Sequence, residues 1–521
     1  MHDLTAGMTL EEQIGQLFVV GFPDQTITPE LLALIERERI GGVILFSRNI
    51  RDREQTRALT HDLQAAARAA GHRAPLLVMT DQENGLVRRL GADSVPFPGA
   101  MALGAIDGPD VEQVVEAVAR ATARELLTHG INMNLAPVVD VNYAPDNPVI
   151  GVRSFGSDPE LVGRLGAATI RGLQGAGVIA TLKHFPGHGD TTVDSHLALP
   201  VVTASPERLE AVELAPFRRG IAAGTDCVMT AHVAFPALTQ DAMTPATLAP
   251  QALTALLRQR LGFEGVVISD CLEMDAIAAT VGVEQGAISA LAAGADLILI
   301  SHTLARQRAG VAAVRAAVEG GALSVERVRA AVARVLQLKR RRLVWSDDAP
   351  APLAGDIVRA HQELSARAYL RAASVIRDVD NLTPLHLHQD QELLALDCPP
   401  RALTVAIDIP YTHTWLVDAL QRYHGRVRAL TLAPDTLDDA LQAAQSADVV
   451  LLSSVNAYRD TESLHVMRRV AQSGRPVIGL ALGNPYDAAA LPEIGAYLAT
   501  YDYSQPAVAA AARVLFGRGE E

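Results

Sequence analysis

The chain has 521 residues, a formal net charge of −14, 49% hydrophobic residues and only 4% aromatic residues. The acidic balance argues against nucleic acid or an anionic membrane as a general partner, and the few aromatics argue against a separate aromatic sugar-binding module. The length exceeds that of one ordinary domain and suits one large and one medium domain.

Cysteine usage and the N-terminal sequence bear on the compartment. Cys227, Cys271 and Cys398 are scattered and odd in number, so they form neither a disulfide framework nor a zinc pattern. The N-terminus has no basic region followed by a long apolar run, so no secretory signal is expected. No run approaches the ~20 apolar residues of a membrane helix. We therefore expect a cytoplasmic setting.

Short apolar runs alternate with helix-patterned segments through the first part of the chain. Their near-continuous apolar character is typical of strands covered on both faces, and they fall at 16–22, 41–47, 75–81, 131–141, 178–184, 227–233, 265–270 and 296–301. Eight such βα units predict a (β/α)8 TIM barrel over residues 1–342, with a doubly wound open sheet as the alternative. Its last helix is expected at about 324–342.

A smaller α/β sandwich domain is predicted after the barrel. Residues 343–356 are acidic and rich in proline and alanine, which indicates a linker. A helix at about 357–373 is expected next, followed by strands at 403–409, 427–432, 447–454, 476–483 and 496–502. This pattern predicts an α/β sandwich over 357–521. We interpret it as a structural or dimerisation module, in a chain that is a monomer or a homodimer.

Polar residues gather at one end of the predicted barrel strands, while the opposite ends show few. Chemistry in such barrels sits at the C-terminal strand ends. The residues there are Asp81, Glu83, Arg88, Arg89, Asp140, Arg153, Lys183, His184, His188, Asp190, Asp194, His196, His232, Asp270 and Glu273. This asymmetry predicts an active site.

Some of these residues also have a purely structural interpretation. Asp270 can cap the helix after it, Asp81 can pair with Arg89, and 194–196 can form an Asx turn.

The same holds for residues of the fourth and sixth strand ends. Arg153 can bridge to Asp140 or Asp158, and His232 can be a core histidine with satisfied hydrogen bonds.

The loop after the fifth strand also offers possible metal ligands. These are His184, His188, Asp190, Asp194 and His196. However, no HxH or HExxH pattern lies on a regular element, and Lys183 and the nearby arginines would repel a cation. No metal is therefore expected.

The strand-end residues suit glycosidic bond cleavage. A retaining glycosidase needs a carboxylate nucleophile and a proton donor, and Asp270 is a rigidly mounted nucleophile candidate. Asp194 and His196 offer a dyad, because histidine can give and take a proton near neutral pH. Charge-assisted hydrogen bonds to sugar hydroxyls can come from Asp81, Arg89, Arg153, Lys183 and His184.

The segment KHFPGHGDTTVDSH (183–196) resembles the signature of glycoside hydrolase family 3, in particular its β-N-acetylglucosaminidase branch. Similar motifs are DQENGLVRRL (81–90), NPVIGVRSFG (147–156), LGFEGVVISDCLEM (261–274) and YLATYDYSQPAVAAAARVLFG (497–517). The resemblance covers nearly the whole chain. It departs at Asn84, Leu86 and Cys271, which leaves substrate detail open.

The resemblance implies a barrel joined to an α/β sandwich and a set of roles. Asp270 would form a glycosyl-enzyme intermediate, and His196, oriented by Asp194, would be the general acid/base. The implied sugar-binding residues are Asp81, Arg89, Arg153, Lys183 and His184, with His232 lining the pocket. No cofactor is implied. The implied substrate is a terminal β-linked N-acetylglucosamine on a cell-wall-derived sugar.

Three other functions stay open. One is another activity of the same family, a β-glucosidase or β-xylosidase, although these usually lack the DSH motif at 194–196. Another is phosphorolysis, because a neutral histidine repels phosphate less than a carboxylate does. The third is a non-catalytic sugar-binding protein.

Overall fold

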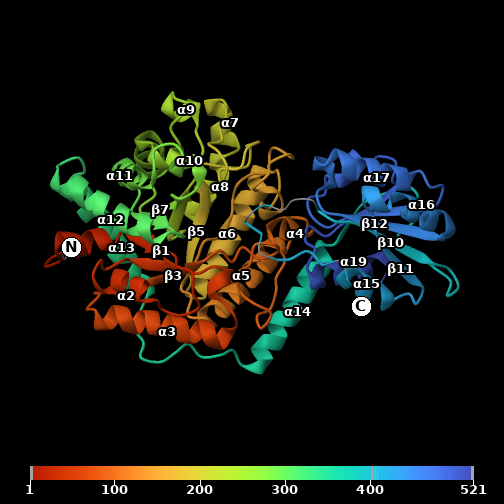
Figure 1. Ribbon diagram of the computed structural model, residues 1–521, viewed down its shortest axis with the longest axis horizontal. Coiled ribbons are helices and arrows are strands. Elements are labelled where there is room, and N and C mark those ends of the chain that lie inside the picture. Colours follow the sequence, from red (N-terminus) through yellow and green to blue (C-terminus); the bar gives the residue numbers. More distant parts are fainter. Residues whose placement is uncertain (1–3, 401–403, 405, 408, 413, 518–521) are drawn as a thin grey trace.

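The computed structural model describes residues 4–400, 404, 406–407, 409–412 and 414–517. It contains a closed barrel and a separate six-stranded sheet, side by side in Figure 1. The barrel has eight parallel strands in chain order, which confirms the predicted TIM barrel. The strands are β1 (Phe18–Val20), β2 (Gly42–Ile44), β3 (Leu77–Thr80), β4 (Met133–Asn134), β5 (Ile179–Phe185), β6 (Cys227–Thr230), β7 (Val266–Cys271) and β8 (Leu297–Ile300).

Alternation along the strands decides which side chains reach the barrel mouth. On β3, Leu77 and Met79 pack in the inner core cluster. Because successive side chains point to opposite faces, the next inward position beyond them is Asp81. The same period of two brings Lys183 on β5 and Asp270 on β7 to the mouth. The carboxyl ends of these strands therefore present charged groups to one shared space.

Helices surround the barrel. The longer ones are α2 (Pro29–Glu36), α3 (Arg53–Ala69), α5 (Val111–Thr128), α6 (Pro159–Gly175), α8 (Leu214–Ala222), α11 (Val283–Ala293), α12 (Leu304–Glu319), α13 (Val325–Arg342) and the π-helix η4 (Gln251–Arg260). Shorter ones are α1 (Leu10–Gly15), α4 (Ala100–Gly104), α7 (Pro206–Ala211), α9 (Pro236–Thr239), α10 (Asp275–Ala278), and the 3₁₀ turns η1 (Ser47–Asn49), η2 (Gly151–Arg153) and η3 (Ala246–Leu248). Helix α13 ends where the sequence predicted.

The second sheet has the order β11-β10-β12-β13-β14-β9, with only β9 antiparallel to its neighbour. Its strands are β9 (Ser374–Asp378), β10 (Leu393–Cys398), β11 (Val427–Thr431), β12 (Val449–Ser454), β13 (Val477–Ala481) and β14 (Ala496–Ala499). Its helices are α14 (Gly355–Ala372), α15 (Thr414–Gln421), α16 (Leu437–Ser446), α17 (Thr461–Ala471), α18 (Asp487–Ala490) and α19 (Gln505–Leu515), with the 3₁₀ turns η5 (Pro434–Thr436) and η6 (Ala457–Arg459).

Both faces of this sheet are covered. On β10, Leu393 packs in one hydrophobic cluster with Leu416 of α15 and Leu515 of α19. Its neighbour Leu394 packs in the other cluster, with Ala440 of α16. This alternation gives the three layers of the predicted α/β sandwich.

One predicted strand of the sandwich differs from the structure. We expected a strand at 403–409, but the described residues within it, 404, 406–407 and 409, are not in a strand, and the rest lie outside the described residues. The strand is instead β10, which pairs with both β11 and β12. The runs at 393–398 and 403–409 are both apolar, so the sequence alone does not show which of them pairs with the neighbouring strands.

Helix α14 connects the barrel to the second sheet (Figure 1). Arg371 forms two 2.8 Å contacts with Asp110 beside the barrel helix α5. His361 Nδ1 lies 2.9 Å from Glu125 of α5, and Tyr369 donates to Asp502 of the second domain. The predicted domain limits stay a prediction. Among the described residues, no helix combines the length and apolarity needed to cross a bilayer.

Candidate active site

A cavity of about 580 Å³ opens at the carboxyl ends of the barrel strands. Most of the predicted site residues line it, namely Asp81, Arg89, Arg153, Lys183, His184, His196 and Asp270. Asp194 lines an adjoining cavity. The doubly wound alternative is excluded by closure of the barrel.

Glu83 is the centre of a buried ionic network. Its carboxylate binds Arg153 in a bidentate pair, at 2.8 Å to Nε and 2.7 Å to Nη2. Lys183 Nζ lies 2.7 Å from Glu83 and 2.8 Å from Asp81. Burial alone would raise the pKa of Glu83, but the two cations lower it far below its usual range. The network holds both cations charged and in place.

This network differs from two ion pairs that the sequence offered as structural alternatives. Asp81 pairs with Lys183, not with Arg89 as the structural interpretation had it. Arg153 pairs with Glu83 rather than with Asp140 or Asp158.

The predicted bridging partners of Arg153 are occupied elsewhere. Asp158 caps helix α6 by accepting from Glu160 N. Asp140 binds the imidazole of His184.

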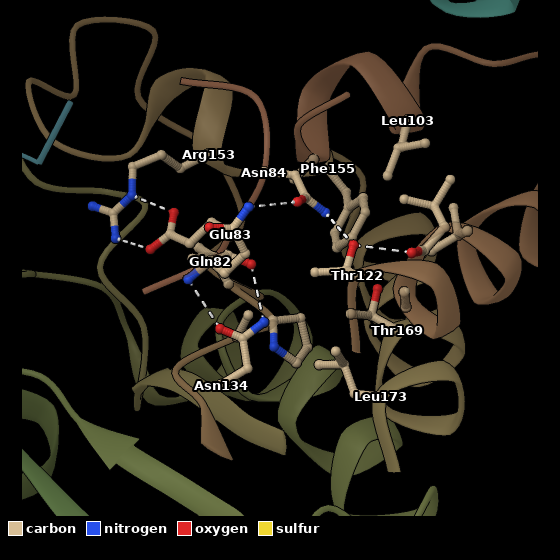
Figure 2. Close-up of a pocket in the computed structure, with 17 residues that line it drawn as sticks. Gln82, Glu83, Asn84, Leu103, Thr122, Asn134, Arg153, Phe155, Thr169 and Leu173 are labelled. Carbon is tan, nitrogen blue, oxygen red and sulfur yellow. Dashed lines mark hydrogen bonds and ion pairs between the residues drawn. The ribbon is translucent and has the colours of Figure 1, made fainter. Parts of the chain in front are cut away.

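The turn that carries Glu83 is fixed to the barrel helices. Asn84 has a positive φ of 71°, a conformation that asparagine tolerates better than most residues. Its Nδ2 donates to Thr122 Oγ1 on α5 at 3.0 Å. Figure 2 shows the result, with Glu83 and Arg153 paired on one side of the turn and Asn84 reaching Thr122 on the other. A small cavity of about 30 Å³ lies between this turn and the helices.

His184 is held by Asp140, which also organises the following loop. His184 Nδ1 lies 2.7 Å from Asp140 Oδ2, and Asp140 Oδ1 accepts from His188 N at 2.7 Å. Burial lowers the pKa of His188 to about 4, so its ring is neutral near pH 7. Its two ring nitrogens contact the hydroxyls of Thr191 and Ser195, each at 2.9 Å. His188 therefore shapes the loop that bears the dyad.

Asp270 sits on strand β7 rather than at a helix start. Helix α10 begins at Asp275, with Met274 as its N-cap, so the alternative capping role of Asp270 is excluded. Burial alone would raise the pKa of Asp270, but the imidazoles of His232 and His184 and the N–H of Cys271 lower it below its usual value. Asp270 is therefore an ionised carboxylate facing the cavity at neutral pH.

His232 lies behind the cavity wall. It is 1% exposed, and its ring nitrogens contact Thr247 Oγ1 at 2.8 Å and Cys271 O at 2.9 Å. Because both nitrogens bond within the protein, this geometry matches a satisfied core histidine rather than the predicted pocket-lining residue. Its ring lies near enough to Asp270 to help lower the pKa of that carboxylate.

Asp194 and His196 form the predicted dyad geometry. Asp194 Oδ1 accepts from the backbone N–H of His196 at 2.8 Å and lies 2.7 Å from its Nδ1. The Asx turn and the dyad are thus the same structure. Burial alone would lower the pKa of His196, but Asp194 and, more weakly, Asp270 raise it above its usual value. The ring can therefore hold a proton close to Asp270.

The second domain reaches the cavity. Ala406 lines it, and its carbonyl accepts from Arg89 Nη1 at 3.1 Å. Arg89 Nη1 therefore donates to a backbone carbonyl of the second domain. From the sequence, that domain was interpreted as a structural or dimerisation module, because it has no polar cluster comparable with the one at the barrel strand ends.

Two features of the cavity had no role assigned from the sequence. Glu83 was noted as a strand-end charge only, although its position two residues after Asp81 on the same turn was an available signal. Phe46 and His302, two residues after the ends of β2 and β8, line the cavity with ring centroids 5.4 Å apart. A single aromatic residue after a strand gives no indication in the sequence that it lines an active site.

The possible metal ligands have other partners. Asp190 pairs with Arg208 at 2.7 Å, and His184 pairs with Asp140. Within the ranges that the structure describes, no three His, Cys, Asp or Glu side chains are grouped to hold a metal ion.

Comparison with known proteins places this arrangement among sugar-cleaving enzymes. The family model described as "Glycosyl hydrolase family 3 N terminal domain" matches residues 9–338. Beta-hexosaminidase A of Pseudoalteromonas piscicida is 32% identical to this chain, over 94% of this chain and 90% of its own length.

Two solved structures match along almost the whole chain. A glycoside hydrolase family 3 beta-N-acetylglucosaminidase from Paenibacillus sp. str. FPU-7 has a TM-score of 0.90 and 38% identity, over 98% of this chain and 97% of its own. A fungal multi-domain GH3 beta-N-acetylglucosaminidase has a TM-score of 0.92 and 39% identity, over 98% of this chain. This chain spans only 59% of that fungal protein.

Proposed function

We propose that this chain, which belongs to glycosyl hydrolase family 3, is a retaining, exo-acting β-N-acetylhexosaminidase. One observation carries the proposal: an ionised carboxylate, Asp270, and a protonatable His196 face the same cavity and each shifts the pKa of the other. The names of the full-length relatives support the acetamido sugar as the group removed.

The proposed reaction has two steps, formation of a glycosyl-enzyme ester and its hydrolysis. Asp270 attacks the anomeric carbon, while His196 gives its Nε2 proton to the leaving oxygen, so a glycosyl ester forms and the glycosidic bond breaks. Water then attacks the same carbon, His196 takes up its proton, and the ester bond to Asp270 breaks. Asp194 orients the ring through Nδ1 in both steps and stabilises its charged form.

The ionic network supports a role in sugar binding. Lys183, Arg153 and the partly exposed carboxylate of Asp81 face the cavity and can bind hydroxyls by charge-assisted hydrogen bonds. His184 and Arg89 line the same wall. Since the cations are already fixed by Glu83 and Asp81, little ordering is needed when the sugar binds.

The biological setting is part of the proposal. We propose that the natural substrates are cell-wall-derived sugars with a terminal β-linked N-acetylglucosamine, and that the enzyme works in the cytoplasm. The three buried cysteines are all free, which supports a reducing compartment.

The test compares hydrolysis of 4-nitrophenyl β-N-acetylglucosaminide with that of 4-nitrophenyl β-glucoside by the same preparation. We expect strong preference for the acetamido sugar. Preference for the glucoside would overturn the acetamido assignment, and binding of the sugar without turnover would indicate a non-catalytic protein. Release of sugar 1-phosphate in phosphate buffer would indicate phosphorolysis instead of hydrolysis.

A further inference from the structure

A cavity of about 260 Å³ lies at the amino ends of the parallel strands β10 and β11 in the second sheet. It is lined by residues 385–388, which precede β10, by Tyr423 and His424, which precede β11, and by Phe516, which follows helix α19. The cavity between the domains, which adjoins the active site, lies instead at the carboxyl ends, where residues 398–400 follow β10. Because β10 has six residues, the two places are separated by roughly 20 Å.

One wall of this amino-end cavity is a pair of stacked aromatic rings. The ring centroids of Tyr423 and Phe516 are 5.5 Å apart, and the ring planes differ by 20°. Phe516 packs against the apolar cluster that includes residues of α15 and α19, whereas Tyr423 is 39% exposed. The pair is therefore anchored on one side and open to a ligand on the other. Aromatic walls of this kind, with a few polar groups beside them, are typical of small-molecule sites.

The polar groups of the cavity are three imidazoles, from His386, His388 and His424. His424 Nε2 lies 2.8 Å from the carbonyl oxygen of Gln391. Because a carbonyl oxygen only accepts, Nε2 carries a hydrogen and the orientation of the ring is fixed. His386 and His388 are exposed. A neutral imidazole offers one donor and one acceptor, which are the two functions that a hydroxyl group requires.

Hydrogen bonds between the three chain segments fix the shape of the cavity. The side-chain oxygen Oε1 of Gln391 accepts from the N–H of His388 at 2.8 Å, while the carbonyl of Gln391 accepts from His424. The N–H of Leu385 donates to the carbonyl of Leu515 at 2.6 Å. The walls are therefore already in place, so little ordering is needed when a ligand binds.

The lining also disfavours other classes of ligand. Among the described residues that line this cavity there is no Lys, Arg, Asp or Glu, so a strongly charged ligand would find no permanent countercharge. In the part of the chain that the structure describes, its histidines do not form a set that could hold a metal ion. A neutral ring that carries hydroxyl groups matches both the aromatic and the imidazole walls.

We infer that this cavity is a second carbohydrate site, which binds one neutral pyranose unit. The apolar face of the sugar packs on Tyr423 and Phe516, and its hydroxyl groups bond to the imidazoles. The inference goes beyond the proposed function, because none of the described residues lines both this cavity and the active site. The chain has too few aromatic residues for a separate sugar-binding module, but one stacked pair is enough for a single sugar unit.

Hydrogen–deuterium exchange of the full chain, measured by mass spectrometry, shows where a sugar binds. The probes are N-acetylglucosamine, glucose, cellotetraose and glucose 6-phosphate. We expect the neutral sugars to slow amide exchange at residues 386–391 about tenfold when each is at ten times its Kd, because binding competes with local opening. Tighter binding of cellotetraose than of glucose would identify a glycan as the ligand, and equal binding a free sugar. Preference for glucose 6-phosphate would overturn the neutral-sugar assignment.

Two variants at exposed positions test the two walls. Tyr423→Ala removes the accessible ring, and His388→Ala removes one imidazole. We expect each to abolish the slowing at 386–391, while N-acetylglucosamine still slows exchange in the active-site loop at 186–197. His465→Ala, exposed on α17, is the matched control and should change neither effect.

The two regions of the chain keep the outcomes apart. No slowing at 386–391 in the wild-type protein, or slowing that survives both variants, would overturn the second site. Absence of any effect of N-acetylglucosamine at 186–197 in the wild-type protein would count against the proposed function instead.

Discussion

The two proposed catalytic groups are mounted in opposite ways. Asp270 projects from β7, a strand with buried neighbours, and it is fixed by the barrel itself. His196 projects from a loop, its side chain is 34% exposed, and short local contacts with Asp194 hold it. A nucleophile must meet a carbon at a fixed distance and angle, whereas a proton donor can approach on a moving loop. The comparison therefore assigns bond formation to the rigid side of the site, which is strand β7 with Asp270. It assigns proton transfer to the loop side, which is the loop that carries Asp194 and His196.

Asp270→Asn tests the rigid side and has the largest expected effect. The amide keeps the shape but lacks the nucleophilic charge, so we expect kcat to fall on the order of 10⁴-fold, the scale seen when a member of a catalytic triad is removed. Steady-state rates on the aryl acetamido substrate measure it. Asp275→Asn, at the exposed start of α10, is the matched control. Near-normal turnover by a folded Asp270→Asn protein would refute the nucleophile.

His196→Ala tests the loop side. General acid catalysis contributes roughly 10²–10⁴-fold, so we expect losses of that size on disaccharides with poor leaving groups. Activated aryl glycosides need less protonation and should lose less. Exposed His465→Ala on α17 serves as control. Equal loss on both substrate types would contradict proton donation by His196.

Glu83→Gln tests whether the rigid side depends on the ionic network. The change leaves Arg153 and Lys183 buried with one carboxylate fewer, and breaking a buried pair typically costs about 3–5 kcal/mol. Chemical denaturation should show this loss. Glu160→Gln removes an exposed pair with Arg219 and should cost below about 1 kcal/mol. Similar losses from both changes would mean that the network does not stiffen the barrel mouth.

Asp194→Asn has the smallest expected effect and concerns pH. Asp194 raises the pKa of His196 above its usual 6.5, so the protonated, active form persists to higher pH. Without this charge the pKa falls, and the alkaline limb of the kcat/KM profile should move to lower pH. The acid limb reports the lowered pKa of Asp270 and should stay in place. If the alkaline limb does not move, His196 is not the group whose deprotonation causes the loss of activity at high pH.

The sequence predicted the barrel well, because strands covered on both faces leave a continuous apolar signal. The charged strand ends were equally visible in the sequence. Asp81, Lys183 and Asp270 each lie two positions beyond an inward-facing residue of their strand, so each faces inward as well. The sandwich was harder to predict. The runs at 393–398 and 403–409 are both apolar, and only their pairing partners tell them apart.

Ion-pair partners were the part that the sequence could not supply. Arg153 lies 70 residues from Glu83, and carboxylates nearer in the chain competed for it in the prediction. The involvement of Ala406 was also hidden, because a backbone carbonyl has no sequence signature. The cavity between the domains likewise depends on how two sheets meet, which no local pattern encodes.

The hydrogen bond between His232 and a backbone carbonyl fixes the tautomer of this buried ring. A carbonyl oxygen can only accept, so Nε2 carries the hydrogen that faces Cys271 O. Burial lowers the pKa of this ring, so near neutral pH Nδ1 carries no hydrogen, and it lies 2.8 Å from Thr247 Oγ1. One tautomer is thus locked, and its ring-nitrogen NMR signals should stay constant while those of His196 titrate.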